Sequence, residues 1–237
     1  MFDATVSDGV LRLARPDARW LSTGFDGGER RADAAYNVTV PEGWDRTDLA
    51  DYVTERRADA GFDADGPALL TGVSQRHARV ARRGPATAVA TAGLSNPAPL
   101  FAADAGSAGH ETASDDAPPV GTVNVFVGVE RSLAPGALSN LVAVAASAKA
   151  ATLSRTAGFP GTTTDAVVAA CDPDAERARF SGTGTAVGAA ARACVRDAVR
   201  ASLDSRYADE EAMPDSVADA RHGVAPVPEA DVEVFEP

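Results

Sequence analysis

The sequence predicts a single α+β domain, with a mostly antiparallel or mixed sheet from the N-terminal half packed against two or three helices. Strand-like runs joined by turns fill the first half of the chain, and the long helical segments lie in the second half. The chain has no regular strand–helix alternation and no internal repeat. Its 237 residues, 45% of them hydrophobic, can bury a large core without disulfides. We therefore expect residues 1–237 to form one domain.

The first half is expected to be rich in strands because short apolar runs alternate with turns that contain Gly and Asp. Residues 4–6 and 10–14 flank a Ser-Asp-Gly turn, and residues 20–23 precede a Gly-Gly turn. Further strands are expected at residues 35–40, 68–71, 78–81, 87–93 and 122–129. A helix is expected over residues 47–59, because its apolar residues share one side and a glycine follows it.

The second half is expected to contain two long helices. The first, over residues 135–156, begins after Ser132 with a proline in its first turn, and the second follows a turn at 182–185 and runs to about residue 203. A buried strand is expected between them, over residues 164–171. The second helix has an apolar stripe, and Arg192, Arg196 and Arg200 are expected to face solvent at i, i+4 spacing.

Two segments fall outside this pattern of strands and helices. Residues 102–119 are rich in Gly, Ser, Asp and Pro without an apolar period, which predicts an exposed, mobile insertion loop. Residues 205–237 are expected to form an acidic tail, in which residues 231–235 are a candidate edge strand.

The charge composition indicates adaptation to salt. Lys149 is the only lysine among 22 basic residues, and 34 acidic residues give a net charge of −12. Together with 51 alanines and 5% aromatic residues, this is typical of a halophilic proteome encoded by a GC-rich genome. We expect a halophilic archaeal source and a cytoplasmic protein, with homo-oligomerisation left open. The acidic surplus argues against nucleic-acid and anionic-membrane partners, and no stretch supports export or membrane insertion.

No metal or cofactor site is indicated by the cysteines and histidines. Cys171 and Cys194 lack the spacing of a disulfide framework or a zinc knuckle, so we interpret both as core residues. His77, His110 and His222 lie in unlike segments, and the motifs of P-loops, zinc proteases and serine hydrolases are absent.

Lys149 is the first candidate functional residue. At about 100° per residue it falls on the same helix face as Leu141 and Leu153. A buried ammonium needs a paired anion or a polar cavity, and the alternative is that the stem packs while the ammonium reaches solvent. Asp165, which closes the Gly-rich run 158–165, is the expected partner.

Two Gly-Thr turns and three asparagines complete the candidate site. Thr163, Thr164 and Asp165 precede the buried strand, although such side chains can also bond only their own turn. Gly182, Thr183 and Thr185 open a helix whose free N–H groups suit an anion or oxyanion, whereas their spacing does not match a dinucleotide loop. The two turns are expected to form opposite walls of one cleft. Neutral amides that could hold an amide-rich ligand are supplied in or beside strands by Asn37, Asn96 and Asn124.

Five motifs, in this order, resemble the adenosylcobinamide amidohydrolase family. They are Ala-Gly-Leu-Ser-Asn-Pro at 92–97, Gly-Thr-Val-Asn at 121–124, Ala-Lys-Ala-Ala-Thr-Leu at 148–153, Gly-Thr-Thr-Thr-Asp-Ala-Val-Val at 161–168 and Ser-Gly-Thr-Gly-Thr at 181–185. The resemblance runs from about residue 20 to 203. Ser147 stands where the family is expected to carry Glu, and residues 102–119 look particular to this sequence.

The resemblance implies a corrinoid-salvage enzyme that hydrolyses the amide joining aminopropanol to the corrin ring, giving adenosylcobyric acid. The cobalt belongs to this substrate, and no cofactor of the protein is implied. We expect Asp165 to act as base, residues 182–185 to contact the oxyanion, Lys149 to assist electrostatically or as proton donor, and the three asparagines to bind corrin amides. A covalent mechanism with Thr164 or Thr163 as nucleophile, activated by Lys149, stays open. The alternative functions are a non-catalytic corrinoid-binding or carrier protein and, more weakly, a nucleotide-binding domain.

Overall fold

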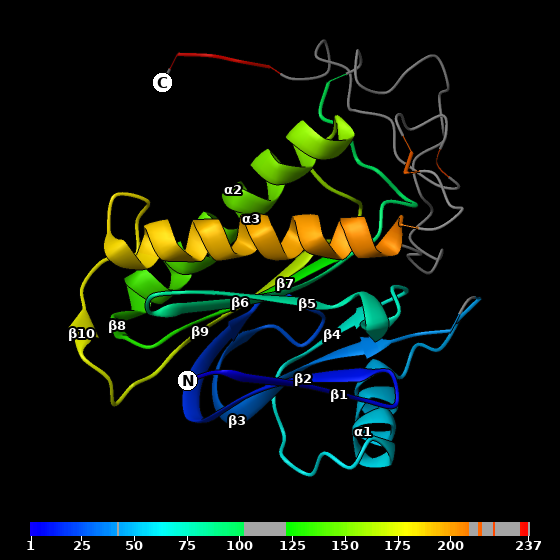
Figure 1. The fold of residues 1–237 in the computed structure, drawn as a ribbon, viewed down its shortest axis with the longest axis horizontal. Helices are drawn as coiled ribbons and strands as arrows, with labels where there is room; N and C mark the ends of the chain where they lie inside the picture. Colours follow the sequence, from blue (N-terminus) through cyan, green and yellow to red (C-terminus); the bar gives the residue numbers. More distant parts are fainter. Residues whose placement is uncertain (42, 102–121, 209–212, 215–219, 221–232, 237) are drawn as a thin grey trace.

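The computed structural model describes residues 1–41, 43–101, 122–208, 213–214, 220 and 233–236. These residues form three α-helices, a mixed sheet of eight strands and a separate pair of short strands. Helices α2 and α3 lie over one side of the main sheet, and the short helix α1 lies at the opposite side (Figure 1). The predicted α+β fold, a mixed sheet packed against two or three helices, is confirmed.

The main sheet has two halves, and its strand order is β4-β3-β2-β9-β7-β6-β5, with β1 paired to β2. The N-terminal half contains β1 (Asp3–Ser7), β2 (Val10–Ser22), β3 (Gly28–Thr39) and β4 (Ala68–Thr71). The other half contains β5 (Arg79–Arg83), β6 (Ala86–Ala92), β7 (Val123–Val129) and β9 (Ala166–Cys171). Pairs β3–β4 and β7–β9 are parallel and the rest are antiparallel. The two-stranded sheet pairs β8 (Ser132–Leu133) with β10 (Arg177–Ala178).

The two halves of the sheet pack against each other, so β6 and β7 are buried on both faces. Val89 and Phe126 join a core with Leu11 and Trp20 from β2, while alternate residues of the same two strands join the core under the helices. Gly128 in β7 admits Phe2 to the first core, because a Cβ there would lie 2.7 Å from the Phe2 ring. This double burial explains why β6 and β7 consist of apolar residues with few polar exceptions.

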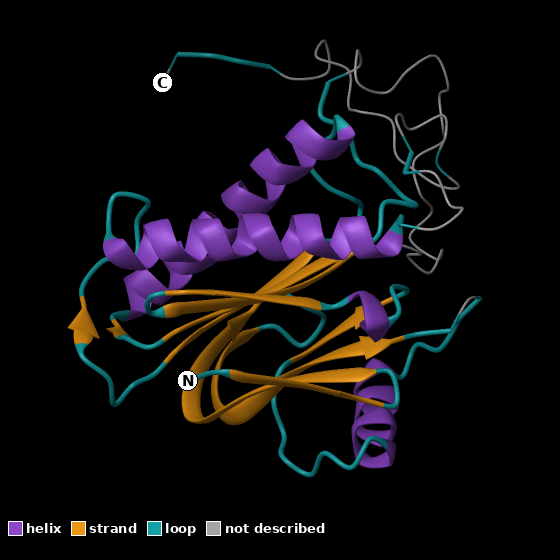
Figure 2. Cartoon of the chain, viewed as in Figure 1, coloured by secondary structure: helices purple, strands orange, loops and turns teal. Residues whose placement is uncertain are grey.

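The helices cover both outer surfaces of this arrangement (Figure 2). Helix α2 (Pro135–Ala157) begins with a proline in its first turn and ends at Gly158, whose φ of 83° suits a left-handed cap. Helix α3 (Ala186–Arg206) begins at Thr185, whose side chain caps it. Helix α1 (Leu49–Asp59), followed by η1 (Gln75–His77) further along, buries Tyr52 and Val53 against β3.

The N-terminal strands differ from the prediction. The two strands expected at 10–14 and 20–23 are one strand, β2, because a bulge between Ala14 and Ala18 lets pairing to β3 continue. Asp17, at φ 53°, adopts the left-handed conformation within that bulge. The strand expected from residue 35 instead begins at Gly28. Its first residues include charged side chains, which do not show the apolar pattern of a strand. Residues 102–119 and most of the acidic tail lie outside the described residues, and residues 233–236 form no strand.

Among the described residues one helix, α2, is long and apolar enough to cross a membrane by length and composition alone. Half of its most apolar window is buried inside the protein, and a single helix of this kind is weak evidence for a membrane span.

Candidate active site

Lys149 lies on the buried face of α2, as predicted, and is only 8% exposed. Its Nζ donates a hydrogen bond to Oδ2 of Asp165, the residue directly before β9. The two side chains form a buried ion pair, 10% and 9% exposed, which confirms the expected partner. The chain reaches this geometry because α2 ends at Gly158 and the following turn brings residue 165 back beneath the last turns of the helix.

The Asp165 carboxylate accepts four hydrogen bonds. Oδ2 accepts from Lys149 Nζ and from the Thr162 backbone N–H at 3.1 Å, and Oδ1 accepts from the Thr162 hydroxyl and from the Val123 N–H at 2.9 Å. An ionised carboxylate offers about four lone-pair positions. All of them are therefore occupied, and Asp165 fixes α2, the 158–165 turn and the start of β7 relative to one another.

Gly161 makes room for this ion pair. A Cβ at position 161 would lie 2.5 Å from Asp165 Oδ2 and 3.2 Å from Lys149 Nζ. Any side chain there would push the carboxylate or the ammonium out of place. The glycine is thus required by close approach rather than by its backbone angles.

The 158–165 turn is also held from the other side. Asn96 donates through Nδ2 to the Thr163 hydroxyl, its carbonyl accepts from the Thr163 N–H at 3.2 Å, and Ala98 N–H donates to the Gly161 carbonyl at 3.0 Å. Asn96 Oδ1 is buried and has no hydrogen-bond partner among the described residues. Asn96 and Thr163 therefore secure the turn directly.

Asn37 and Asn124 join the two halves of the sheet. Asn124 Nδ2 donates to Asn37 Oδ1 at 2.8 Å and to the Leu70 carbonyl at 2.9 Å, and Asn37 Nδ2 donates to Thr91 Oγ1 at 2.8 Å. Each asparagine is 1% exposed. The remaining acceptor, Asn124 Oδ1, has only a 3.4 Å contact from the Thr122 hydroxyl.

A cavity of about 690 Å³ opens beside Asp165. Around Asp165 its polar lining comes from the end of β4, the start of β7 and the residues before β9, namely Thr71, Thr122, Asn124, Thr164 and Asp165. Loop residues add further polar groups, namely Thr23, Asp45, Arg46 and Thr47. Its apolar lining includes Phe25, Trp44, Leu49 and Leu69. Small-molecule sites commonly have volumes of about 300–1,000 Å³ and combine apolar walls with polar groups that orient the ligand. Of the three predicted asparagines, Asn124 alone is in this lining.

The second Gly-Thr turn lies elsewhere, and the expected shared cleft is wrong. Ser181 hydrogen bonds to Ala137 and Asn140 in the first turns of α2, and α3 begins beside the start of α2 (Figure 1). Ser202, by contrast, lies over the Ala92 end of β6, next to Val123. Sixteen helical residues, or about 24 Å, separate Thr185 from that end. Gly182, Thr183 and Thr185 therefore cannot contact a group held at Asp165.

Sequence reasoning missed several residues of the cavity. Thr122 lies in the Gly-Thr-Val-Asn motif without a role assigned from the sequence, and its hydroxyl is held by the Thr164 carbonyl. Thr162, which bonds to Asp165 but does not line the cavity, is likewise unassigned. Phe25, Trp44 and Thr71 gave no signal, because only the tertiary fold brings the loops and the β4 end to the cavity.

The cysteines and histidines lie apart from this cavity. Cys171 and Cys194 are free and buried, as predicted, and burial raises the pKa of both thiols. His77 bonds through Nδ1 with Ser205 at 3.1 Å, and burial lowers its pKa; His110 and His222 lie outside the described residues. The described part of the chain holds no group of three or more His, Cys, Asp or Glu that could ligate a metal.

The chain matches the adenosylcobinamide amidohydrolase family profile over residues 3–211. An adenosylcobinamide amidohydrolase from Halobacterium salinarum is 58% identical over 239 residues, covering 100% of each chain. One from Methanosarcina mazei is 26% identical over 204 residues, covering 82% of this chain and 94% of its own. The crystal structure of the PH0078 protein from Pyrococcus horikoshii covers 85% of this chain and 78% of its own at 13% identity, with a TM-score of 0.42, too low to bear on function.

The Halobacterium relative agrees with the halophilic composition of this chain. The profile match spans most of the sequence, and the full-length relative shares more than half of its residues. On this evidence the chain belongs to the adenosylcobinamide amidohydrolase family.

Proposed function

We propose that this protein hydrolyses the amide of adenosylcobinamide that links aminopropanol to the corrin ring, in the cytoplasm of a salt-adapted cell. One water is consumed, the C–N bond breaks, and adenosylcobyric acid and aminopropanol leave. The main structural support for this proposal is the buried Lys149–Asp165 pair beside a cavity of about 690 Å³. The chain is also 58% identical over its full length to a curated adenosylcobinamide amidohydrolase. The cobalt enters with the substrate, and no cofactor of the protein is part of the proposal.

Asp165 is assigned as the base that takes a proton from the attacking water. Three of its four hydrogen-bond donors are a paired ammonium and two backbone N–H groups, which cannot leave without moving an element. The fourth, the Thr162 hydroxyl, can rotate away and open a lone pair on Oδ1. The protonated carboxyl can then pass the proton to the leaving amine.

Lys149 is assigned a positioning and electrostatic role. It is not among the residues that line the cavity, and its ammonium reaches Asp165 from the α2 side. It therefore holds Oδ2 of Asp165 in place while Oδ1 accepts the proton from water. Its charge stabilises the anionic carboxylate before proton transfer.

The oxyanion contact is assigned to Thr71, since residues 182–185 are too distant. Thr71 lines the cavity, is 2% exposed and accepts from the Val73 N–H at 3.1 Å. Within the described residues its hydroxyl proton has no acceptor, so it can donate to a carbonyl oxygen that becomes negative during attack.

Substrate contacts are assigned to the remaining lining of the cavity. Asn124 Oδ1 can accept from a primary amide of the corrin rim, because its present contact at 3.4 Å is weak. Asn37 and Asn96 support this region by holding Asn124 and the 158–165 turn. Phe25 and Trp44 offer apolar surface to the methyl-bearing ring.

The covalent route keeps Thr164 as its candidate nucleophile. Thr164 lines the cavity, whereas Thr163 is exposed, bonded to Asn96 and absent from that lining. In this route Thr164 Oγ1 attacks the carbonyl carbon, aminopropanol leaves, and water cleaves the resulting ester.

The test is incubation of the purified full chain with adenosylcobinamide in concentrated KCl, followed by mass spectrometry. We expect equal amounts of adenosylcobyric acid and aminopropanol. Saturable binding without product would replace the hydrolase with the corrinoid carrier, and failure to bind would refute both. Hydroxylamine quenching during turnover should yield no hydroxamate if water attacks directly.

A further inference from the structure

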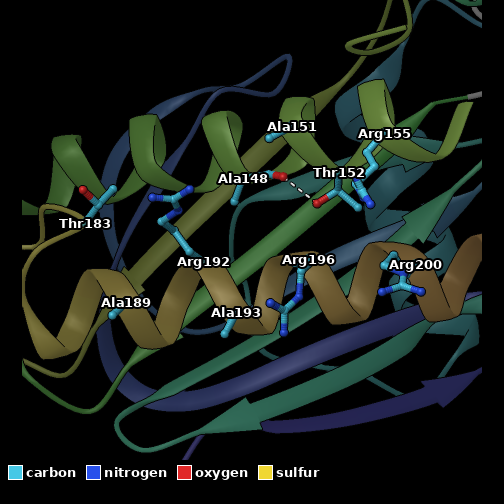
Figure 3. Close-up of a pocket in the computed structure, with 10 residues that line it drawn as sticks. All are labelled: Ala148, Ala151, Thr152, Arg155, Thr183, Ala189, Arg192, Ala193, Arg196 and Arg200. Atoms are coloured by element: carbon cyan, nitrogen blue, oxygen red, sulfur yellow. Dashed lines mark hydrogen bonds between the residues drawn. The ribbon is translucent and has the colours of Figure 1, made fainter. Parts of the chain in front are cut away.

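A second groove, of about 620 Å³, lies between α2 and α3 (Figure 3). Four arginines line it, Arg155 from α2 and Arg192, Arg196 and Arg200 from α3. Arg192 reaches from α3 towards α2, and Arg155 reaches from α2 towards α3 (Figure 3). A concave space bordered by cationic side chains on both sides is a different feature from the cavity at Asp165.

Two of these arginines, Arg155 and Arg192, have no carboxylate partner within the described part of the chain. Arg196 pairs with its neighbour Asp197 at 2.7 Å, and the same carboxylate interacts electrostatically with Arg200, which makes no hydrogen bond or ion pair of its own among the described residues. Elsewhere, arginines such as Arg19 pair with carboxylates. The chain has 34 acidic residues and a net charge of −12, so a groove lined by four arginines contrasts with its overall charge. Like charges at i, i+4 also repel along α3.

The groove stays open because its floor is made of small residues. Ala148 and Ala151 from α2 face Ala189 and Ala193 from α3. Longer side chains at these positions would fill the space between the guanidinium groups. Thr152 and Thr183 add hydroxyl groups to the lining.

We propose that this groove binds a small oligophosphate, a ligand with two or more linked phosphate groups. Guanidinium forks bind phosphate oxygens in pairs, and a ligand that spans Arg192 to Arg200 must carry charge over about 12 Å, more than one phosphate provides. The volume and concavity suit a small ligand better than the surface of an acidic protein.

The oligophosphate site is separate from the proposed reaction. Ala148 and Thr152 line the groove, whereas Lys149 between them points to Asp165. A ligand can therefore occupy the groove without entering the cavity beside Asp165. In molar salt, where the Debye length is about 3 Å, only direct and multidentate contacts hold an anion. Clustered guanidinium groups supply such contacts.

The test is isothermal titration of the full chain with inorganic tripolyphosphate in about 2 M KCl. We expect saturable binding, weakened about tenfold or more by Arg192→Gln, with no change for the matched control Arg177→Gln, an exposed arginine in β10. Ala189→Glu, which introduces a carboxylate at an exposed helical position of the groove, should weaken binding to a similar degree. Orthophosphate should bind much more weakly than tripolyphosphate.

Comparison with ATP identifies the source of the phosphates. Equal affinity indicates recognition of the phosphate chain alone, and tighter ATP binding indicates a nucleotide; either supports the shared chemistry. The proposal is overturned if the parent shows no saturable binding, if Arg177→Gln loses as much affinity as Arg192→Gln, or if orthophosphate binds equally well. If the protein binds polyglutamate but does not bind tripolyphosphate, the proposal is overturned in favour of an acidic protein partner.

Discussion

Lys149 combines burial, charge and restricted space at one atom. Its ammonium contacts Asp165 beside Gly161, where even an added Cβ would lie 3.2 Å from Nζ, so the space around this contact is narrow. A guanidinium places its donors on a planar fork rather than at a point, so arginine cannot reproduce this contact. In a chain whose other basic residues are arginines, the site retains the one side chain that fits.

We predict that Lys149→Met abolishes most hydrolysis and lowers the free energy of unfolding by about 3–5 kcal/mol, because Asp165 is left buried without its cation. Lys149→Arg should also fail. Steady-state rates and urea unfolding measure the two effects. A near-parental rate for either variant would remove Lys149 from the mechanism.

Thr164→Val separates the two mechanisms. If water attacks directly, the variant should keep kcat within about tenfold of the parent, because no bond to Thr164 forms. If Thr164 is the nucleophile, turnover disappears. The parent would then give a corrinoid adduct at Thr164 that peptide mass spectrometry detects.

Thr162→Val tests how Asp165 is released for proton transfer. Removing the hydroxyl frees Oδ1 permanently, so we expect kcat to be retained or raised while stability falls by about 1 kcal/mol. Asp165→Asn is a poorer probe, because its amide NH₂ would face a hydrogen-bond donor on either side. A Thr162→Val enzyme that folds but is inactive would contradict the rotating-hydroxyl scheme.

The central ion pair of the site is predictable from the sequence. Helical periodicity placed Lys149 on the buried face, and the cost of an unpaired charge pointed to Asp165. Local spacing could not reveal that Thr71 and Trp44 line the cavity beside Asp165, because their positions depend on how the strands pair across the molecule.

The start of α3 illustrates a limit at the level of elements. The Gly-Thr turn was correctly predicted to open a helix, and Thr185 caps it by accepting from the Gly188 N–H at 3.0 Å. Which end of the sheet that helix start occupies depends on the direction of α3 across β6 and β5. The turn chemistry was therefore predictable, whereas its distance from Asp165 was not.

Thr185→Ala should lower stability by about 1 kcal/mol and leave kcat and KM unchanged, because the lost cap is about 24 Å from the Ala92 end of the sheet. Urea unfolding and steady-state kinetics provide the two readouts. A selective loss of kcat in Thr185→Ala would show that the 182–185 turn takes part in the reaction.

Strand boundaries show the same limit. The chain from Val10 to Ser22 was expected as two strands because Pro16 and Asp17 interrupt the apolar pattern. The bulge accommodates both residues and lets one strand continue to β9. Strands β6 and β7 are easier to recognise, since both faces are buried and each strand is an almost continuous run of apolar residues.

For the whole molecule, the net charge of −12 predicts a strong dependence on salt. Repulsion among surface carboxylates reaches across about 30 Å at 0.01 M salt but only about 3 Å at 1 M. We expect Tm, measured by calorimetry, to rise steeply with KCl. A flat profile would show that the acidic surplus serves solubility alone.

Strand β9 has a consequence for how the protein is made. It pairs with β2 on one side, where Arg19 faces Cys171, and with β7 on the other, so among the described strands β9 carries the only backbone pairing between the two halves of the sheet. A ribosome must therefore synthesise and release residue 171 before the N-terminal strands meet their final partner. Until then the apolar faces that carry Trp20 and Phe126 are not packed against each other, and exposed apolar surfaces of this kind make a partly synthesised chain prone to aggregation.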